Sequence, residues 1–198
     1  MRHIHMFDRI SADGYFGAPD GNLDWVIQDE ALERDTMANR GNHDAMMFGR
    51  KTYEGFKSFW PTAVDASPTS PAPHGPARRN EALKAMGEFI NRSTKYVFSH
   101  SLKDVSWEGT QLLGDFDPGK VEQIKRGPGG DILLFGSGSI ASLLTAHGLI
   151  DQYTFVVSPI LLGSGQRAIR DVIANVKLVL EEVKQFPTGN LRLRYAKA

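Results

Sequence analysis

The chain has 198 residues, 41% of them apolar and 23% charged, which is ordinary for one globular domain with a buried core. Lysine plus arginine and aspartate plus glutamate balance at 23 each, so no overall positive field favours nucleic acid or an anionic membrane surface. Cysteine is absent, which excludes disulfides, thiolate metal sites and cysteine nucleophiles.

Residues 2–10 alternate polar and apolar side chains and predict a first strand, with Ile4 and Met6 facing a core. This segment lacks the apolar region of a signal peptide, and no later run approaches the ~20 apolar residues of a membrane span. We therefore expect a cytoplasmic protein that does not enter a membrane. A glycine-rich loop over 11–22 follows, and its two Asp-Gly pairs predict tight turns with positive φ.

A modestly amphipathic helix is expected over 28–41, followed by an apolar strand over 44–48. The next helix is predicted to start at Arg50 and to end at Trp60-Pro61, because proline cannot continue the backbone hydrogen bonding. Residues 61–77 contain five prolines interleaved with serine, threonine and alanine. We interpret this segment as an exposed insertion within the domain.

The second half continues the alternation of helices and strands. Helices are predicted over 78–91, from an N-cap at Asp117 to Gly127, and from about 138 to Gly148. The predicted strands cover residues 95–98, 131–135 and 152–157, and an antiparallel hairpin is formed by 177–185 and 190–196. This order predicts a single α/β domain over 1–198, with a mostly parallel central sheet, helices on both faces and an antiparallel C-terminal edge hairpin.

Two segments share one layout, in which an apolar strand runs through a glycine into a helix. They are Ala45-Met46-Met47-Phe48-Gly49-Arg50 and Ile132-Leu133-Leu134-Phe135-Gly136-Ser137-Gly138. Helix N-termini favour anions because their backbone N–H groups and dipole point outward. Two such junctions predict a ligand with more than one phosphate, for which a dinucleotide is the natural candidate.

Neither junction has the G-x-G-x-x-G pattern of a Rossmann site, and a Walker A loop is absent as well. Arg50 at a helix start suits a 2′-phosphate, which favours NADP over NAD. The alternative is that Gly49 makes only a tight turn and Arg50 is a solvated charge. Ser99-His100 ends a third strand and either adds phosphate contacts or forms a turn.

Asp24 follows the glycine loop between Leu23 and Trp25, which would partly desolvate it and suit it to proton transfer. A helix N-cap or a turn aspartate is the alternative interpretation. A metal site is not expected. His3 and His5 share a strand face, but no third ligand occurs at a convincing spacing.

These motifs together resemble the dihydrofolate reductase-like superfamily. The resemblance is strongest to stand-alone proteins similar to the reductase domain of the bifunctional riboflavin-biosynthesis deaminase-reductase. It covers nearly the whole chain and is carried by Ser11-Ala12-Asp13-Gly14-Tyr15-Phe16, Gly21-Asn22-Leu23-Asp24-Trp25, Phe48-Gly49-Arg50-Lys51-Thr52-Tyr53-Glu54, Trp60-Pro61, Val97-Phe98-Ser99, Gly136-Ser137-Gly138 and Gly148-Leu149-Ile150-Asp151.

The resemblance implies an NADPH-dependent fold with a central sheet of about eight strands. It assigns the phosphates of the cofactor to Gly49, Arg50 and Thr52, and the adenosine end to Ser99 and His100. The pyrophosphate would lie against Gly136, Ser137, Gly138, Ser139 and Ile140. Asp13, Gly14 and Phe16 would belong to a loop that closes over the nicotinamide. Trp25, Trp60 and Pro159 would surround the substrate, with Asp24 or a water as the proton source.

The expected function is transfer of a hydride from NADPH to a C=N or C=O group of a small heterocyclic or sugar-derived substrate, either riboflavin-pathway aminouracil-type or pterin-like. One alternative is a non-catalytic NADP-binding protein, and another is an interaction module that uses its proline-rich segment. A homodimer is expected, on family grounds and because the terminal hairpin leaves an open sheet edge.

Overall fold

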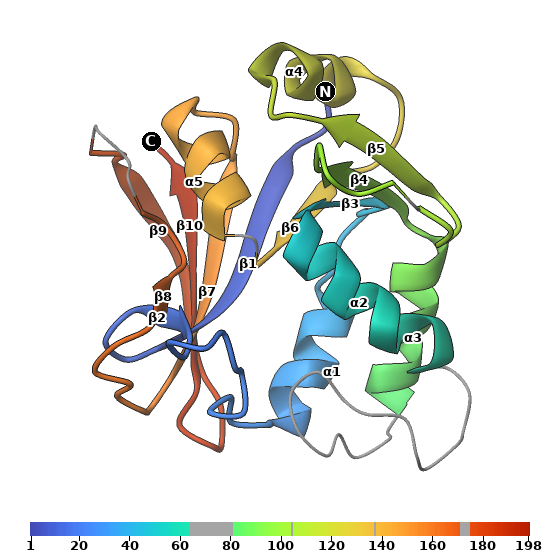
Figure 1. Cartoon of the computed structure of the whole chain (residues 1–198). Helices are drawn as coiled ribbons and strands as arrows, with labels where there is room; N and C mark the ends of the chain where they lie inside the picture. Colours follow the sequence, from blue (N-terminus) through green and yellow to red (C-terminus); the bar gives the residue numbers. More distant parts are fainter. Residues whose placement is uncertain (64–80, 104, 137, 171–174) are drawn as a thin grey trace.

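The computed structural model describes residues 1–63, 81–103, 105–136, 138–170 and 175–198. An eight-stranded sheet in the order β5-β4-β3-β6-β1-β7-β10-β9 forms the middle layer, with helices on both faces (Figure 1). The proline-rich insertion from residue 64 onward, the start of the helix expected at 78 and Ser137 lie outside the described residues. Among the described residues, no helix is both long and apolar enough to cross a bilayer.

Six neighbouring strands are parallel, and two antiparallel strands complete the sheet at one edge. The parallel strands are β1 (Ile4–Ser11), β3 (Ala45–Gly49), β4 (Thr94–Phe98), β5 (Thr110–Gly114), β6 (Ile132–Phe135) and β7 (Gln152–Ser158), and the edge hairpin is β9 (Leu178–Gln185) with β10 (Leu191–Lys197). Two further strands, β2 (Tyr15–Gly17) and β8 (Gln166–Arg167), pair with each other outside the main sheet.

The helices divide between the two faces of the sheet. One face is covered by α1 (Glu30–Ala38), α2 (Arg50–Ala63) and α3 (Glu81–Arg92), and the other by α4 (Pro118–Arg126) and α5 (Gly138–Ala146) (Figure 1). The predicted architecture is therefore confirmed, including its antiparallel edge hairpin.

Alternating side chains of the strands feed two separate cores. On the α5 face, Ile4 and Met6 of β1 are fully buried with Leu144 of α5. On the α2 face, Phe48 packs with Tyr53 and the rest of a cluster rich in aromatic residues. Because successive residues of a strand point to opposite faces, the even-numbered residues of β1 face α5 and the odd-numbered ones face α1.

Three sequence-based expectations were wrong in detail. The helix that starts at Arg50 continues through Pro61 to Ala63, whose burial in the aromatic cluster offsets the missing backbone hydrogen bond. The helix expected over 28–41 is shorter and begins after an N-cap at Asp29. Strand β5 was missed, because its sequence, Thr-Gln-Leu-Leu-Gly, is half-exposed at a sheet edge and has no clear alternation.

Candidate functional site

Strands β1 and β6 part at the carboxyl ends of the parallel strands, and the place where they part is termed the crevice. The β1–β6 pairing ends at Phe7 opposite Phe135, whereas β1 stays paired with β7 as far as Ser11 opposite Ser158. From β1 the chain crosses by α1 toward β3, and from β6 it crosses by α5 toward β7 on the other face (Figure 1). The connections from β1 and β6 thus run in opposite directions along the sheet, and such a topological switch point is where open α/β sheets bind their ligands.

The first glycine junction ends β3 at this edge. Gly49 is the last residue of the strand and Arg50 is the first residue of α2, whose first turn contains no acidic side chain. The Arg50 guanidinium is 3.2 Å from a carboxylate oxygen of Glu54, and both side chains are almost half exposed. An exposed ion pair of this kind contributes little to stability, so a phosphate can replace Glu54 at small cost.

The second junction lies directly beside the first. Gly136 has a left-handed φ of +50°, and a Cβ built on it would lie 3.5 Å from Oγ1 of Thr52 in α2. Beyond it, Gly138 and Ile140 are buried at the start of α5, while Ser139 is exposed. The two helix N-termini that were inferred separately from the sequence therefore share one wall of the crevice.

The β2–β8 sheet covers the start of α5. A Cβ on Gly138 would lie 3.0 Å from the carbonyl oxygen of Arg167 and 3.3 Å from the ring of Phe16. Gly14 has a φ of +87° in the turn before Phe16, as the Asp-Gly pair predicted. Only glycine leaves room at position 138 for the close approach of the Arg167 carbonyl and the Phe16 ring.

Asp13 ties the loop before β2 to the loop after β7. Its carboxylate accepts hydrogen bonds from the hydroxyl of Ser11 and from the backbone N–H groups of Leu162 and Gly163. These hydrogen bonds, that from Ser11 above all, lower the pKa of Asp13 to about 2. Asp13 thus holds together the two loops that flank the crevice and remains ionised.

The third strand end, after β4, presents Ser99 and His100. The Ser99 hydroxyl accepts hydrogen bonds from the backbone N–H groups of Ser101 and Leu102, which makes a tight turn. His100 is exposed and lies 3.0 Å from Asp115. Because β4 is next to β3, this turn lies on the Arg50 side of the crevice.

Asp8 is a buried carboxyl group at the point where β1 and β6 part. Its Oδ1 accepts a hydrogen bond of 2.6 Å from the Gly136 N–H, whereas its Oδ2 is buried and has no hydrogen-bond partner among the residues that the structure describes. Burial raises the pKa of Asp8 from 3.8 to about 7, although the Gly136 N–H opposes this shift. Sequence reasoning missed Asp8, for which the available signal was an acid at a core-facing position between Met6 and Ile10.

Arg9 projects from the other face of β1, toward α1. Its hydrogen bond to the carbonyl of Ile27 is long, at 3.5 Å, and no carboxylate lies within ion-pair distance of it among the described residues. Burial lowers the pKa of Arg9, and the nearby charges of Glu33 and Asp29 oppose this effect. A desolvated guanidinium with one weak contact is suited to an anionic ligand.

The remaining site residues expected from the sequence do not gather in one place. Asp24 is exposed and accepts a 2.7 Å hydrogen bond from Asn22, so the expected desolvation of its carboxylate is absent. Trp60 is buried among aromatic rings, and Trp25 is half-buried; the indole N–H of each is buried without a partner. Pro159 is exposed after β7.

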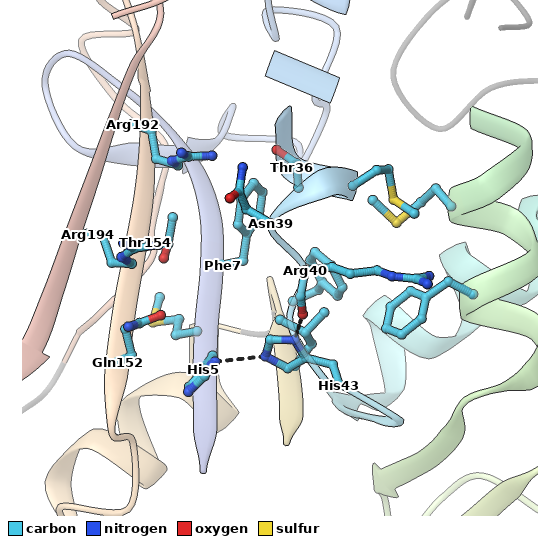
Figure 2. Close-up of a pocket in the computed structure, with 16 residues that line it drawn as sticks. His5, Phe7, Thr36, Asn39, Arg40, His43, Gln152, Thr154, Arg192 and Arg194 are labelled. Carbon is cyan, nitrogen blue, oxygen red and sulfur yellow. Dashed lines mark hydrogen bonds between the residues drawn. The ribbon is translucent and has the colours of Figure 1, made fainter. Parts of the chain in front are cut away.

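A cavity of about 70 Å³ lies on the α1 face of the sheet (Figure 2). Its walls include Phe7 and Phe135, whose rings meet edge to face, and the buried Arg192. Buried polar atoms without hydrogen-bond partners also occur here, on Thr36, Arg192 and Arg194. Such atoms are suited to ordered water or to the polar edge of a ligand.

The chain is similar to known proteins over nearly its whole length. The family model of the RibD C-terminal domain matches residues 2–191. The chain is 23% identical to YyaP of Bacillus subtilis over 98% of this chain and 95% of that protein.

Solved structures of similar fold include a pyrimidine reductase-like protein from Corynebacterium diphtheriae, with a TM-score of 0.67, 14% identity and coverage of 100% of this chain and 92% of that one. Another is dihydrofolate reductase from Enterococcus faecalis complexed with NADP(H), with a TM-score of 0.56, 12% identity and coverage of 98% and 96%. At these identities the structures establish a common dihydrofolate reductase-like fold.

Proposed function

Since this chain belongs to the RibD C-terminal domain family, we propose that it is an NADPH-dependent reductase. The substrate would be a small heterocyclic or sugar-derived molecule with a polarised C=N or C=O group. Aminouracil-type intermediates of riboflavin biosynthesis and pterins both belong to this class.

The observation that carries this proposal is the shared wall of the two glycine junctions, with Asp8 beside it. The left-handed φ of Gly136 and the close approach of the Arg167 carbonyl and the Phe16 ring to Gly138 favour glycine at both positions of the second junction. Among the described residues, the buried Oδ2 of Asp8 has no hydrogen-bond partner, as is expected where a ligand supplies one. These features fit a dinucleotide lying across the carboxyl ends of β3, β6 and β1.

The residues inferred from the sequence would divide the cofactor among them. Arg50 and Thr52, after Gly49, would hold the 2′-phosphate, with Ser99 and His100 at the adenosine end. The second junction, from Gly136 to Ile140 at the start of α5, would receive the pyrophosphate. Asp13, Gly14 and Phe16 would close the nicotinamide end.

When bound, NADPH supplies the hydride, and the chain must orient the substrate, exclude water and provide a proton. Two carboxyl groups are candidates for the proton, the exposed Asp24 and the buried Asp8. We favour Asp8, because a pKa near 7 keeps it partly protonated at neutral pH. Trp25, Trp60 and Pro159 would surround the substrate, and Arg9 would bind an anionic group of it.

The test compares two exposed arginines that form similar ion pairs within a helix. Arg50 pairs with Glu54 at the proposed site, and Arg126 pairs with Glu122 in α4. We expect Arg50→Ala to weaken NADPH binding about tenfold or more and to leave NADH unchanged, because only NADPH carries the 2′-phosphate. Arg126→Ala should bind both cofactors as the unmodified chain does.

Isothermal titration calorimetry measures these affinities directly. Equal losses for NADPH and NADH would contradict the role of Arg50, and no uptake of either NADP form at about 1 mM would refute the proposed cofactor. NADPH oxidation is then measured across a panel of pterins, pyrimidinones and aldehydes. Tight binding without turnover on any of them would favour the alternative, a non-catalytic NADP-binding protein.

A further inference from the structure

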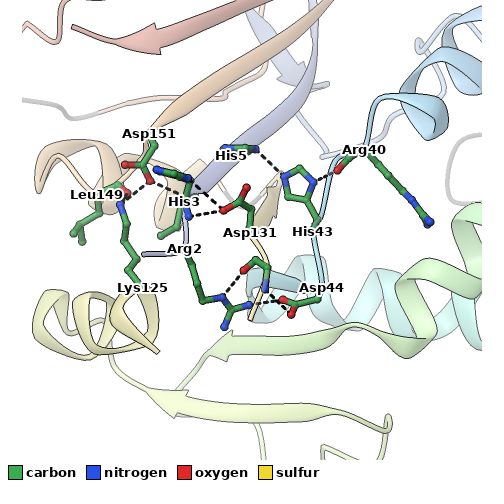
Figure 3. A network of polar contacts seen from close by, with 12 residues as sticks. Arg2, His3, His5, Arg40, His43, Asp44, Lys125, Asp131, Leu149 and Asp151 are labelled. Atoms are coloured by element: carbon green, nitrogen blue, oxygen red, sulfur yellow. Dashed lines mark hydrogen bonds and ion pairs between the residues drawn. The ribbon is translucent and has the colours of Figure 1, made fainter. Parts of the chain in front are cut away.

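The imidazoles of His3, His5 and His43 and the carboxylate of Asp131 meet at the amino ends of β1 and β6 (Figure 3). The crevice lies at the carboxyl ends of the same strands. His3 and His5 point to the same face, with their rings nearly parallel and their centroids 6.2 Å apart. The Ile4–Ile132 pairing of the two strands brings Asp131 beside His3. The sequence offered no third ligand because Asp131 is distant along the chain and is placed here only by the fold.

The distances suit a single bound ion. One ligand atom from each of His3, His5 and Asp131 lies within 4.8 Å of the others. Around an ion with bonds of ~2.1 Å, neighbouring ligand atoms lie about 3.3 Å apart. The side chain of His3 is 54% exposed, so it can turn to close this difference, whereas Asp131 is fixed by a 2.8 Å hydrogen bond from the His3 backbone N–H.

Asp131 is distinguished from the other carboxylates of this network. Asp44 lies 2.6 Å from Arg2, and Asp151 lies 2.6 Å from Lys125. Within the part of the chain that the structure describes, Asp131 has no lysine or arginine within ion-pair distance, and its charged neighbours are histidines. Its negative charge therefore remains available to a cation.

His43 fixes the orientation of His5. The Nδ1 of His43 donates a short hydrogen bond to the carbonyl of Arg40, so its Nε2 carries a lone pair. This Nε2 lies 2.7 Å from the Nδ1 of His5, which must then donate its proton and leave the His5 Nε2 with a lone pair.

We propose that His3, His5 and Asp131 bind one divalent transition-metal ion of the zinc type, with His43 supporting His5 from behind. Imidazole and carboxylate ligands favour zinc, cobalt or nickel, whereas magnesium and calcium prefer oxygen ligands alone. Water would complete the coordination on the exposed side of His3. The ion would join the start of β1 to the start of β6 and so stabilise the strand pair that separates at the crevice.

The experiment uses the full chain without a histidine tag, stripped of metal with EDTA. Titration with Zn²⁺ by calorimetry should give one site per chain, and Co²⁺ should give the visible absorption of a nitrogen- and oxygen-ligated ion. Saturating Zn²⁺ should also raise the melting temperature, because an ion that binds only the folded state stabilises it. Each measurement is independent of NADPH and of reductase activity.

Variants assign the ligands. His3→Gln and Asp131→Asn should each abolish the one-site binding of Zn²⁺, and His43→Gln should weaken it about 10- to 100-fold, as loss of an outer-shell partner does. His147→Ala is the matched control, since His147 is exposed and belongs to no such cluster among the described residues. The absence of saturable Zn²⁺ binding by the unmodified chain, or full affinity in both His3→Gln and Asp131→Asn, would overturn the proposal.

Discussion

Replacing Asp8 with asparagine should stabilise the protein by a margin that is considerably larger at pH 8 than at pH 5. In the folded chain, burial raises the pKa of Asp8 from 3.8 to about 7. Between these two values the unfolded chain loses this proton while the folded chain keeps it. The folded state therefore loses stability as the pH rises from about 4 to 7, and the loss is complete above pH 7.

The rise in pKa sets the magnitude of the effect. Each tenfold change in proton affinity corresponds to about 1.4 kcal/mol, so the full change corresponds to about 4 kcal/mol. Asparagine keeps a carbonyl oxygen to accept the hydrogen bond from Gly136 and carries no charge at any pH. We expect Asp8→Asn to exceed the unmodified chain in free energy of unfolding by a margin that grows by about 2–3 kcal/mol between pH 5 and pH 8, because roughly the first 1–2 kcal/mol of the effect is already present at pH 5.

Urea unfolding, followed by far-UV circular dichroism at several pH values between 5 and 8, measures this difference. Asp24→Asn is the matched control, because Asp24 is exposed and its replacement should give a difference that is small and independent of pH. A flat difference for Asp8→Asn across this range would refute the buried, protonated carboxyl. The same two variants, compared in a pH–rate profile, decide which aspartate supplies the proton of the proposed reduction.

Three further predictions test other parts of the site. Gly138→Ala places a methyl group 3.0 Å from the Arg167 carbonyl, so it should lower the free energy of unfolding by about 1–3 kcal/mol and weaken NADPH binding. The control Gly55→Ala lies in open space on α2 and should raise the free energy of unfolding by roughly 0.5–1 kcal/mol. Equal melting temperatures for the two variants would contradict the close approach at Gly138. Arg9→Met should raise the melting temperature, because it removes a desolvated charge, and should also raise the KM of an anionic substrate about tenfold. A fall in both the melting temperature and the KM would exclude the proposed role of Arg9. Val179 and Val183 of the edge strand β9 are 54% and 57% exposed, and we propose that they pair the chain into a homodimer. Val183→Glu should then halve the mass seen by light scattering, and an unmodified chain that is already monomeric would count against the dimer.

Local sequence signals sufficed for most elements of the fold. The Asp117-Pro118 start of α4 and the terminal hairpin each depend on residues adjacent in sequence, and both predictions were confirmed. The two glycine junctions were recognised in the same way. Their contact through Thr52 and Gly136 depends on the order of the strands, which no local pattern specifies.

The chemistry of β1 was harder to predict. Asp8 and Arg9 interrupt an apolar strand, and nothing near them in sequence indicates that the partner strand ends opposite Phe7. Their burial without complete hydrogen bonding follows from that early end. Likewise, Asp131 is 128 residues from His3 along the chain and comes beside it only because β1 and β6 pair in parallel. Rules based on the sequence spacing of metal ligands therefore do not detect it.

The neighbouring positions Asp8 and Arg9 point to opposite sides of one strand, the first toward Gly136 and the second toward Ile27. An insertion or deletion of one residue upstream in β1 would exchange the acid and the base between the two sides. Point substitution at odd positions, by contrast, alters only the α1 side. Under the proposed function, such substitutions would alter the substrate contacts of Arg9 while the acid beside the second junction stays as it is.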